Sequence, residues 1–153
     1  MTTTRNSELT IARLLDDFFA EVAEGARPTT VRRLATVRMH LEAYLDEHAW
    51  HVLTSRQLAI LRAEQQHNPV GAFARTMGAE DLFFAFSCYL RPEYRLRNVV
   101  DARCQVRVIG QLTQWLYARG LLANWRDMAC IALDIECALR EARRSLATAA
   151  AQP

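Results

Sequence analysis

Arginine is the side chain through which this sequence could do the most chemistry. All 19 basic residues are arginine, none is lysine, and the formal net charge of the 153-residue chain is +2. The planar guanidinium fork binds phosphate and carboxylate groups through paired hydrogen bonds, and it also reads guanine in the major groove of DNA. A GC-rich genome produces the same preference for arginine, so the count alone does not establish a binding function. The positions of the arginines carry more information.

Charge is distributed unevenly along the chain. Residues 8–24 hold five acidic residues and one arginine, whereas residues 27–39 hold four arginines and no acidic residue. Residues 91–119 hold six arginines and two acidic residues. A run of one sign is usually a solvated helix face, and such runs also occur on surfaces that bind nucleic acid. The two arginine-rich stretches are therefore the candidate binding elements.

Helical spacing gives the polar side chains of both stretches a direction. In the first stretch, Arg32 and Thr36 lie opposite Leu34 and Leu41, and in the second the polar residues lie opposite Leu112. The outward-facing residues are Thr29, Arg32, Arg33, Thr36 and His40 in the first stretch and Arg103, Arg107, Gln111 and Gln114 in the second. Arginine, threonine, histidine and glutamine are donors to phosphates and base edges. Both faces could also be solvated surface without a ligand.

No other set of residues predicts an active site. His48 and His51 are three residues apart, but no cysteine or carboxylate completes a zinc ligand set around them, so we expect no metal and no cofactor. Asp16 and Asp17 belong to an acidic helix face, which is solvated by default. The chain contains no nucleophile-elbow, P-loop or dinucleotide-binding motif. We expect a protein that is not an enzyme.

The composition predicts one soluble cytoplasmic domain. No apolar run is long enough to span a membrane, and residues 1–15 lack the apolar core of a secretory signal. The four cysteines lie within apolar helical pattern without CxxC spacing, which predicts reduced core cysteines; they are Cys88, Cys104, Cys130 and Cys137. We expect a single helical domain over residues 1–153, with an ordered core from about residue 8 to about residue 147.

The elements that position the arginines are expected to be helices throughout. Apolar residues recur at helical spacing, and glycine and proline are scarce. The first two predicted helices cover residues 10–24 and 29–48, and a third opens at residues 53–55 and ends before Asn68. A short helix or turn at 69–77 follows, and then helices over 80–90, 96–119 and 124–147, with Gly25 and Gly120 as stops, Asn124 as a cap and fraying from Thr148 onward. Residues 80–90 are expected to form the central buried helix. The fold class is all-α, a compact bundle of six to seven helices.

Several segments resemble the core-binding domain of tyrosine recombinases, which is the SAM-like N-terminal domain of phage integrases. They are TIARLLDDFF at 10–19, RPTTVRRL at 27–34, LEAYL at 41–45, DLFFAF at 81–86 and, within 103–122, LTQWLYARGLL at 112–122. The resemblance implies a SAM-like helical domain that clamps one face of duplex DNA. The DNA-facing residues that it implies are Thr29, Thr30, Arg32, Arg33, Thr36, Arg103, Arg107, Gln111 and Gln114.

The sequence also departs from this family. Asn124 is followed by Trp125 rather than by proline, and the connection over residues 46–79 is longer than in the family. The family's catalytic arginines, HxxR motif and nucleophilic tyrosine have no counterpart. The resemblance therefore implies a DNA-binding module without recombinase activity.

Two functions are consistent with these patterns. The first is a non-catalytic helical module that contacts double-stranded DNA through the two arginine-bearing faces. The second is a helical protein-interaction or dimerisation module without a nucleic-acid role, in which Trp50, Trp125 and the Ala/Leu-rich last helix supply an apolar interface. A homodimer is compatible with both, because symmetric dimers often bind palindromic DNA sites.

Overall fold

Every regular element in the described part of the chain is helical. The computed structural model describes residues 9–122 and 128–151. The α-helices in these ranges are α1 (Ile11–Ala23), α2 (Pro28–His48), α3 (Ser55–His67), α4 (Ala72–Thr76), α5 (Ala79–Tyr89), α6 (Val99–Ala118) and α7 (Ala129–Ala151), and two 3-10 helices, η1 (Ala49–Val52) and η2 (Pro92–Tyr94), join them. The expected all-α bundle of six to seven helices is confirmed at this level.

Local sequence signals explain where the helices begin and end. The Thr10 hydroxyl caps α1 by accepting from the Arg13 N–H, and Thr54 forms a capping box with Gln57 at the start of α3. The predicted stops at Gly25 and Gly120 are confirmed, since both glycines adopt positive φ after α1 and α6.

Two predicted boundaries differ from the structure. The long helix expected from about Leu96 begins at Val99, because the Asn98 side chain accepts hydrogen bonds from the Val100 and Asp101 N–H groups and caps the helix there. The fraying expected from Thr148 is wrong, since α7 continues to Ala151. Its last turns are rich in alanine, the best helix former. Asn124, expected to cap this helix, lies outside the described residues.

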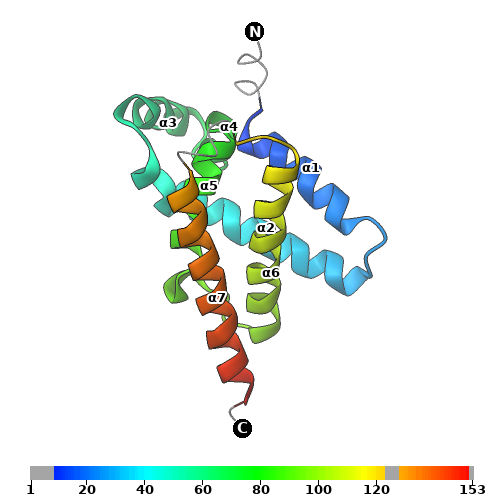
Figure 1. The fold of residues 1–153 in the computed structure, drawn as a ribbon. Helices are drawn as coiled ribbons and strands as arrows, with labels where there is room; N and C mark the ends of the chain where they lie inside the picture. Colours follow the sequence, from blue (N-terminus) through cyan, green and yellow to red (C-terminus); the bar gives the residue numbers. More distant parts are fainter. Residues whose placement is uncertain (1–8, 123–127, 152–153) are drawn as a thin grey trace.

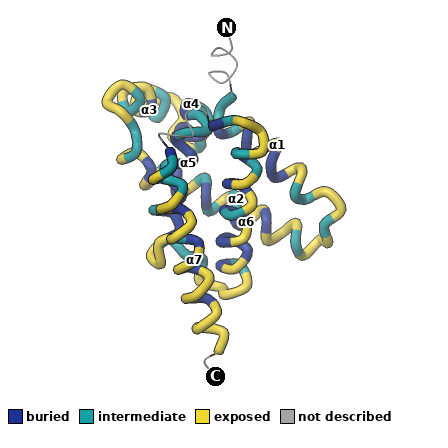
Figure 2. Tube along the Cα trace, viewed as in Figure 1, coloured by how far each residue is buried: buried dark blue, intermediate teal, exposed yellow. Residues whose placement is uncertain are grey.

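The helices pack around a central buried helix. Helices α1 and α2 run antiparallel through the turn at Gly25, α6 crosses α2, and α7 lies beside α6 and in front of α5 (Figure 1). As predicted, α5 is the central helix: Leu82, Phe83 and Phe86 have no exposed surface. The buried stretches of α5 and α6 lie at the middle of the molecule, whereas the outer turns of α3 and α7 are exposed (Figure 2).

Helix α7 packs on α6 and α5 through one narrow stripe. Ile135, Leu139, Ala142 and Leu146 recur at three- and four-residue spacing and are all buried. Gly110 of α6 faces this stripe: a Cβ atom at Gly110 would lie 3.1 Å from Arg143 Nη2 and 4.0 Å from two Leu139 carbons. The small residue therefore lets α7 approach α6 closely.

The expectation that all four cysteines belong to the core is wrong for two of them. Cys104 is buried and Cys88 is half-buried, but Cys130 and Cys137 are exposed on α7. Leu133 on the same helix is 61% exposed. The apolar residues of α7 cover more than one helix face; the stripe through Ile135 and Leu139 is buried, Ile131, Ala132 and Ala138 are partly buried against the core, and Leu133, Cys130 and Cys137 are exposed. None of the helices within the described ranges is long and apolar enough to cross a membrane.

Candidate functional site

Two groups of described arginines differ in their partners. The first group is ion-paired with carboxylates, mostly where α1, α2 and α6 meet. Its members are Arg13 with Asp17 at 4.0 Å, Arg33 with Asp101 at 3.9 Å, Arg38 with Asp16 and with Glu42 at 2.9 Å, Arg75 with Glu64 at 3.1 Å, and Arg119 with Glu21 at 2.8 Å. These guanidinium groups hold elements of the fold together.

Arg38 is the best enclosed member of this ion-paired group. Its guanidinium lies over the Phe19 ring, 5.6 Å from the ring centroid, and its side chain is 29% exposed. Burial alone lowers the pKa of Arg38, but the hydrogen bonds to Asp16 and Glu42 outweigh it and raise the pKa above its usual value. Arg38 therefore joins α1 to α2 as a permanent cation.

Glu21 ties the end of α1 to the end of α6. Its Oε2 accepts hydrogen bonds from Trp115 Nε1 and from Arg119 Nη2, both at 2.8 Å. The Arg119 guanidinium also stacks over the Trp115 ring at 4.7 Å, and Trp115 packs edge-on against Phe18. Arg119 is therefore engaged within the fold through its ion pair with Glu21 and its contact with the Trp115 ring.

The second group of arginines lies between α6 and α7. We call this group the α6–α7 arginine face; it consists of Arg103, Arg107, Arg140 and Arg143. Arg103, Arg107 and Arg143 line a shallow hollow of about 300 Å³, and Arg107, Arg140 and Arg143 line an adjoining groove of about 660 Å³. Because Arg107 and Arg143 line both, the hollow and the groove adjoin along the two helices.

The arginine face lacks counter-charge in the described part of the chain. None of its four guanidinium groups forms an ion pair with a described carboxylate, and Glu136 is the one acidic residue lining its grooves. Arg107 contacts Cys104 Sγ at 3.6 Å. Burial raises the pKa of the Cys104 thiol, so this sulfur stays protonated and supplies no negative charge. The four guanidinium groups of the face are therefore not ion-paired within the described part of the chain.

Polar side chains extend the arginine face along α6. Gln111 and Gln114 are exposed and line the larger groove beside Arg107. Arg103, Arg107, Gln111 and Gln114 all face outward, as the helical spacing predicts. The four residues of the long helix that the sequence analysis singled out therefore share one surface.

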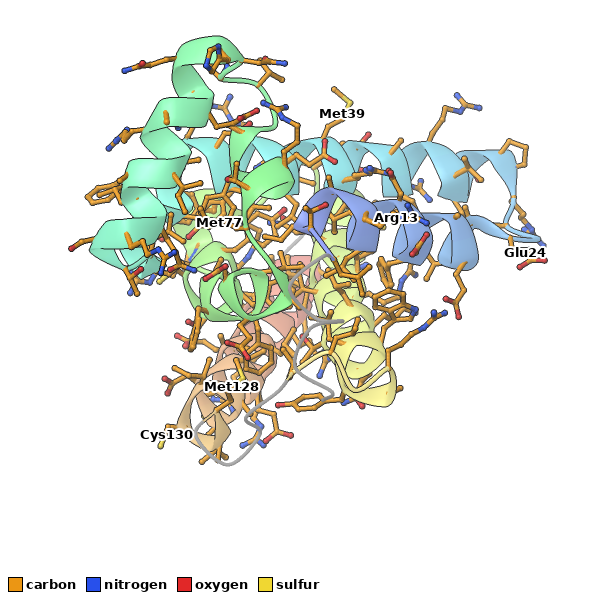
Figure 3. The ribbon with its side chains drawn as sticks, turned by 90° about the horizontal axis from the view of Figure 1, so that it is seen from above. Arg13, Glu24, Met39, Met77, Met128 and Cys130 are labelled. Atoms are coloured by element: carbon orange, nitrogen blue, oxygen red, sulfur yellow. The ribbon has the colours of Figure 1, made fainter. Side chains whose placement is uncertain are left out.

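The residues singled out on α2 do not join that surface as a group. Arg33 reaches α6 but is paired there with Asp101. Arg32 and Thr36 are exposed on the strip of α2 that also carries Met39, and Figure 3 shows Met39 pointing away from α6 and α7. The Thr36 hydroxyl donates to the Arg32 carbonyl at 3.1 Å. Thr29 is exposed and Thr30 is half-buried at the first turn of α2.

Sequence reasoning missed the contribution of α7. Arg140 and Arg143 follow Leu139 by one and four residues, so they flank the stripe that packs on α6. A helical wheel of residues 129–151 would have shown both arginines beside the apolar stripe of this helix. What the sequence does not show is that α7 runs beside α6, and this neighbour relation brings the arginines of the two helices together.

The histidines are engaged in local contacts. His40 Nδ1 and the Tyr89 hydroxyl are 2.8 Å apart, and His51 Nδ1 lies 2.6 Å from the His48 carbonyl oxygen. Burial lowers the pKa of His40 and raises the pKa of Tyr89, so a neutral imidazole faces a protonated hydroxyl. Among the described residues no three histidine, cysteine or acidic side chains gather in a group that could hold a metal ion.

Comparison with known proteins does not place the chain in a family. No protein-family model, no curated protein and no solved structure matches it. The function therefore has to be argued from the α6–α7 arginine face itself.

Proposed function

We propose that the protein is a non-catalytic DNA-binding module whose α6–α7 arginine face contacts the phosphate backbone of duplex DNA. The observation that carries the proposal is the gathering of four arginines without a carboxylate partner on two adjacent, exposed helix faces. Like charges held close together repel one another, and an external polyanion relieves that repulsion. Duplex DNA supplies such an anion as a regular row of phosphates.

The dimensions of the face agree with a short stretch of duplex. Arg103 and Gln114 are separated by eleven helical residues, which corresponds to about 17 Å along α6. At 3.4 Å per base step this length covers about five steps of one strand. Phosphate contacts fix the register of a protein on DNA, whereas base contacts supply sequence preference. Gln111 and Gln114 are the side chains in this groove suited to contact base edges.

The proposal shares part of the DNA surface that the resemblance to integrase core-binding domains implies. The α2 residues that the resemblance also implies are not part of the proposed surface; they are Thr29, Thr30, Arg32, Arg33 and Thr36. The resemblance implies DNA contacts by Arg103, Arg107, Gln111 and Gln114, which lie on the proposed surface. The arginines of α7 are an addition to that pattern. A SAM-like relationship, a role beside DNA recombination and a cytoplasmic location all belong to this proposal; all four cysteines are free thiols, as is usual in a reducing compartment.

Salt dependence of binding tests the electrostatic part of the proposal. Four phosphate contacts predict that log K falls with log salt at a slope of about −3.6, or roughly a hundredfold loss of affinity between 50 and 200 mM salt. Fluorescence anisotropy with a short labelled duplex measures this slope. Lack of binding at the lower salt concentration would overturn the proposal.

A matched pair of double variants tests the location of the surface. Arg107→Ala with Arg143→Ala removes two unpaired arginines, and Arg13→Ala with Arg119→Ala removes two ion-paired ones while changing the net charge equally. We expect the first variant to lose about a hundredfold in affinity and about two units of salt slope, because a charge-assisted contact contributes about 1.5 kcal/mol. We expect the second to bind within about threefold of the wild type. Equal losses would show that only net charge matters.

Self-association is a second candidate function, and one observation favours it. Leu133 is 61% exposed on α7, and the exposed Cys130 and Cys137 lie on the same strip, three and four residues away. A second copy of α7 would cover this strip. Sedimentation equilibrium tests it: a dimer that Leu133→Glu dissociates supports self-association, and a monomer at all concentrations rejects it.

A further inference from the structure

An apolar hollow lies at one end of the α6–α7 arginine face. We call it the α6–α7 hollow; its walls are Thr113 and Tyr117 of α6 and Ala132, Leu133, Ile135 and Leu139 of α7, and its volume is about 460 Å³. Gly110, Gln114 and Glu136 line both this hollow and the larger arginine-lined groove. The apolar hollow and the cationic groove are therefore continuous.

The size and lining of the hollow are those of a small-molecule site. Ligand pockets generally have volumes of roughly 300–1,000 Å³, with mostly apolar walls and a few polar groups that fix orientation. Gly110 lies where the hollow meets the groove, and its lack of a side chain lets Leu139 and Arg143 of α7 come close to α6 there. Apolar walls alone would accept many compounds, so the charged groups decide which chemistry fits.

Along α7, the acidic residue lies nearer the apolar walls of the hollow and the two arginines lie farther away. Arg140 and Arg143 lie eight and eleven residues beyond Ala132, about 12 to 17 Å along the helix. Glu136 stands between the apolar walls and these arginines. An anionic group is repelled beside Glu136 and attracted at Arg140 and Arg143, so a bound molecule has one favourable orientation.

We propose that the α6–α7 hollow binds a small amphipathic anion, whose apolar body fills the hollow and whose carboxylate, sulfonate or phosphate group pairs with Arg140 and Arg143. Guanidinium groups bind such oxyanions through short, charge-assisted hydrogen bonds. The two parts of the ligand thus meet matching surfaces at opposite ends of one continuous cavity. This inference concerns ligand binding and stands whether or not the protein binds DNA.

A consequence for regulation follows from the shared arginines. The ligand's anionic group would occupy Arg140 and Arg143, which also belong to the proposed DNA surface. Ligand and DNA would therefore compete, and the ligand would release the protein from DNA. This competition, unlike ligand binding itself, rests on the proposed DNA-binding function.

Anilinonaphthalene sulfonate is a suitable probe, since it joins an aromatic body to a sulfonate. We expect it to bind the full chain at a single saturable site in isothermal titration, and the uncharged phenylnaphthylamine to bind about tenfold more weakly or less. We expect Arg140→Gln with Arg143→Gln to erase most of that difference between the two probes. Equal affinity for the charged and uncharged probes, or several weak sites, would overturn the proposal.

A filling variant tests the hollow independently of the arginines. Ala132→Trp places a large side chain in the hollow, and Ala149→Trp places the same side chain on the exposed end of α7. Loss of sulfonate binding in the first variant and retention in the second supports the proposal; retention in both overturns it. Circular dichroism establishes that each variant is folded. Should Ala132→Trp fail to fold, the comparison between charged and uncharged probes in the wild type decides the matter.

The competition is measured by adding the sulfonate to the complex with labelled duplex. Release of DNA at the concentrations that saturate the hollow supports the regulatory consequence, and undiminished DNA binding at saturation overturns it. Sulfonate binding without any DNA binding would overturn the proposed function and leave the ligand site intact. DNA binding without sulfonate binding would overturn the ligand site and leave the proposed function intact.

Discussion

The two arginine-rich regions of the molecule use the same side chain in different ways. At the α1–α2 side, Arg38 bridges Asp16 and Glu42 and lies over Phe19. At the α6–α7 side, Arg107 and Arg143 line a groove that Glu136 also lines, and neither arginine is ion-paired with a described carboxylate. The first arrangement stabilises a helix pair, and the second leaves charge free for a partner. Whether an arginine is ion-paired within the fold or left without a carboxylate depends on its neighbouring residues and not on the number of arginines in the region.

The two helix contacts must also be stabilised differently. Ion pairs and an aromatic face support the contact between α1 and α2, whereas arginines on both sides of the α6–α7 groove repel one another. What holds α7 in place is its apolar stripe together with the close approach at Gly110. Removing an ion-paired arginine at the α1–α2 side should therefore lower the free energy of unfolding, whereas removing an unpaired arginine at the α6–α7 side should leave it nearly unchanged or raise it slightly.

Removing apolar contact at α7 should have the largest effect. Leu139→Ala truncates a side chain that is 7% exposed, and we expect a loss of about 2–5 kcal/mol in the free energy of unfolding. Leu133→Ala is the matched control on the same helix, with an expected change within about 0.5 kcal/mol because Leu133 is mostly exposed. Urea denaturation followed by circular dichroism measures both. Similar losses in the two variants would mean that the stripe does not hold α7.

Removing an ion-paired arginine should have an intermediate effect. Arg38→Ala breaks contacts with Asp16 and Glu42 and uncovers Phe19, and we expect a loss of about 1–2 kcal/mol, between the values for exposed and buried pairs. The same truncation at Arg143, which has no carboxylate partner, should cost less than about 0.5 kcal/mol. Urea denaturation of the two variants side by side compares the regions directly. An equal loss of unfolding free energy in both variants would show that the ion-paired and the unpaired arginine contribute equally to stability.

Removing an unpaired arginine should be slightly stabilising. Arg103 and Arg107 are four residues apart on α6, and like charges at this spacing destabilise a helix by about 0.2–0.5 kcal/mol. We expect Arg103→Gln to raise the free energy of unfolding by that amount at low salt and to have no effect at high salt, where the repulsion is screened. Arg13→Gln, which breaks the pair with Asp17, should show the opposite sign. A destabilised Arg103→Gln would point to a partner for Arg103.

The effect of pH on the free energy of unfolding should be the smallest of these effects, and it should arise from His40 of α2. Burial lowers the pKa of His40 below its unfolded value, so the unfolded state binds more protons as the pH falls. The stability due to neutral His40 is therefore complete above the unfolded pKa of about 6.5 and is lost as the pH falls below it. Urea denaturation between about pH 5 and pH 8 should show this slope in the wild type and a shallower one in His40→Gln. Helices α6 and α7 contain no histidine, so DNA affinity should be constant from pH 6.5 to 8.

Much of the fold could be predicted from local signals in the sequence. Capping residues such as Thr10 and stops such as Gly25 mark helix ends, and the outward direction of Arg107 follows from its spacing relative to Leu112. These features depend on residues within one or two turns of each other. The all-helical fold and the outward face of α6 were accessible for this reason.

The composition of the candidate site depends on contacts that local sequence does not specify. Arg33 and Arg107 look alike on a helical wheel, yet Arg33 meets Asp101 from a distant helix and Arg107 meets other arginines. The error at Cys137 has the same origin, since an apolar residue is buried only where another element covers it. Packing of the whole chain determines which helices become neighbours. The neighbouring helix in turn determines whether an arginine meets a carboxylate or remains unpaired.

The Glu21 contact also bears on how the chain is made. Its partner Trp115 lies 94 residues later in the sequence, so the contact cannot form until α6 has been synthesised. At 5–20 residues per second, the ribosome needs roughly 5 to 20 s to cover that interval. Until then, the edge of Phe18 that packs on Trp115 in the folded protein lacks that ring. Synthesis of α6 supplies both the indole that packs on Phe18 and the donor that bonds to Glu21.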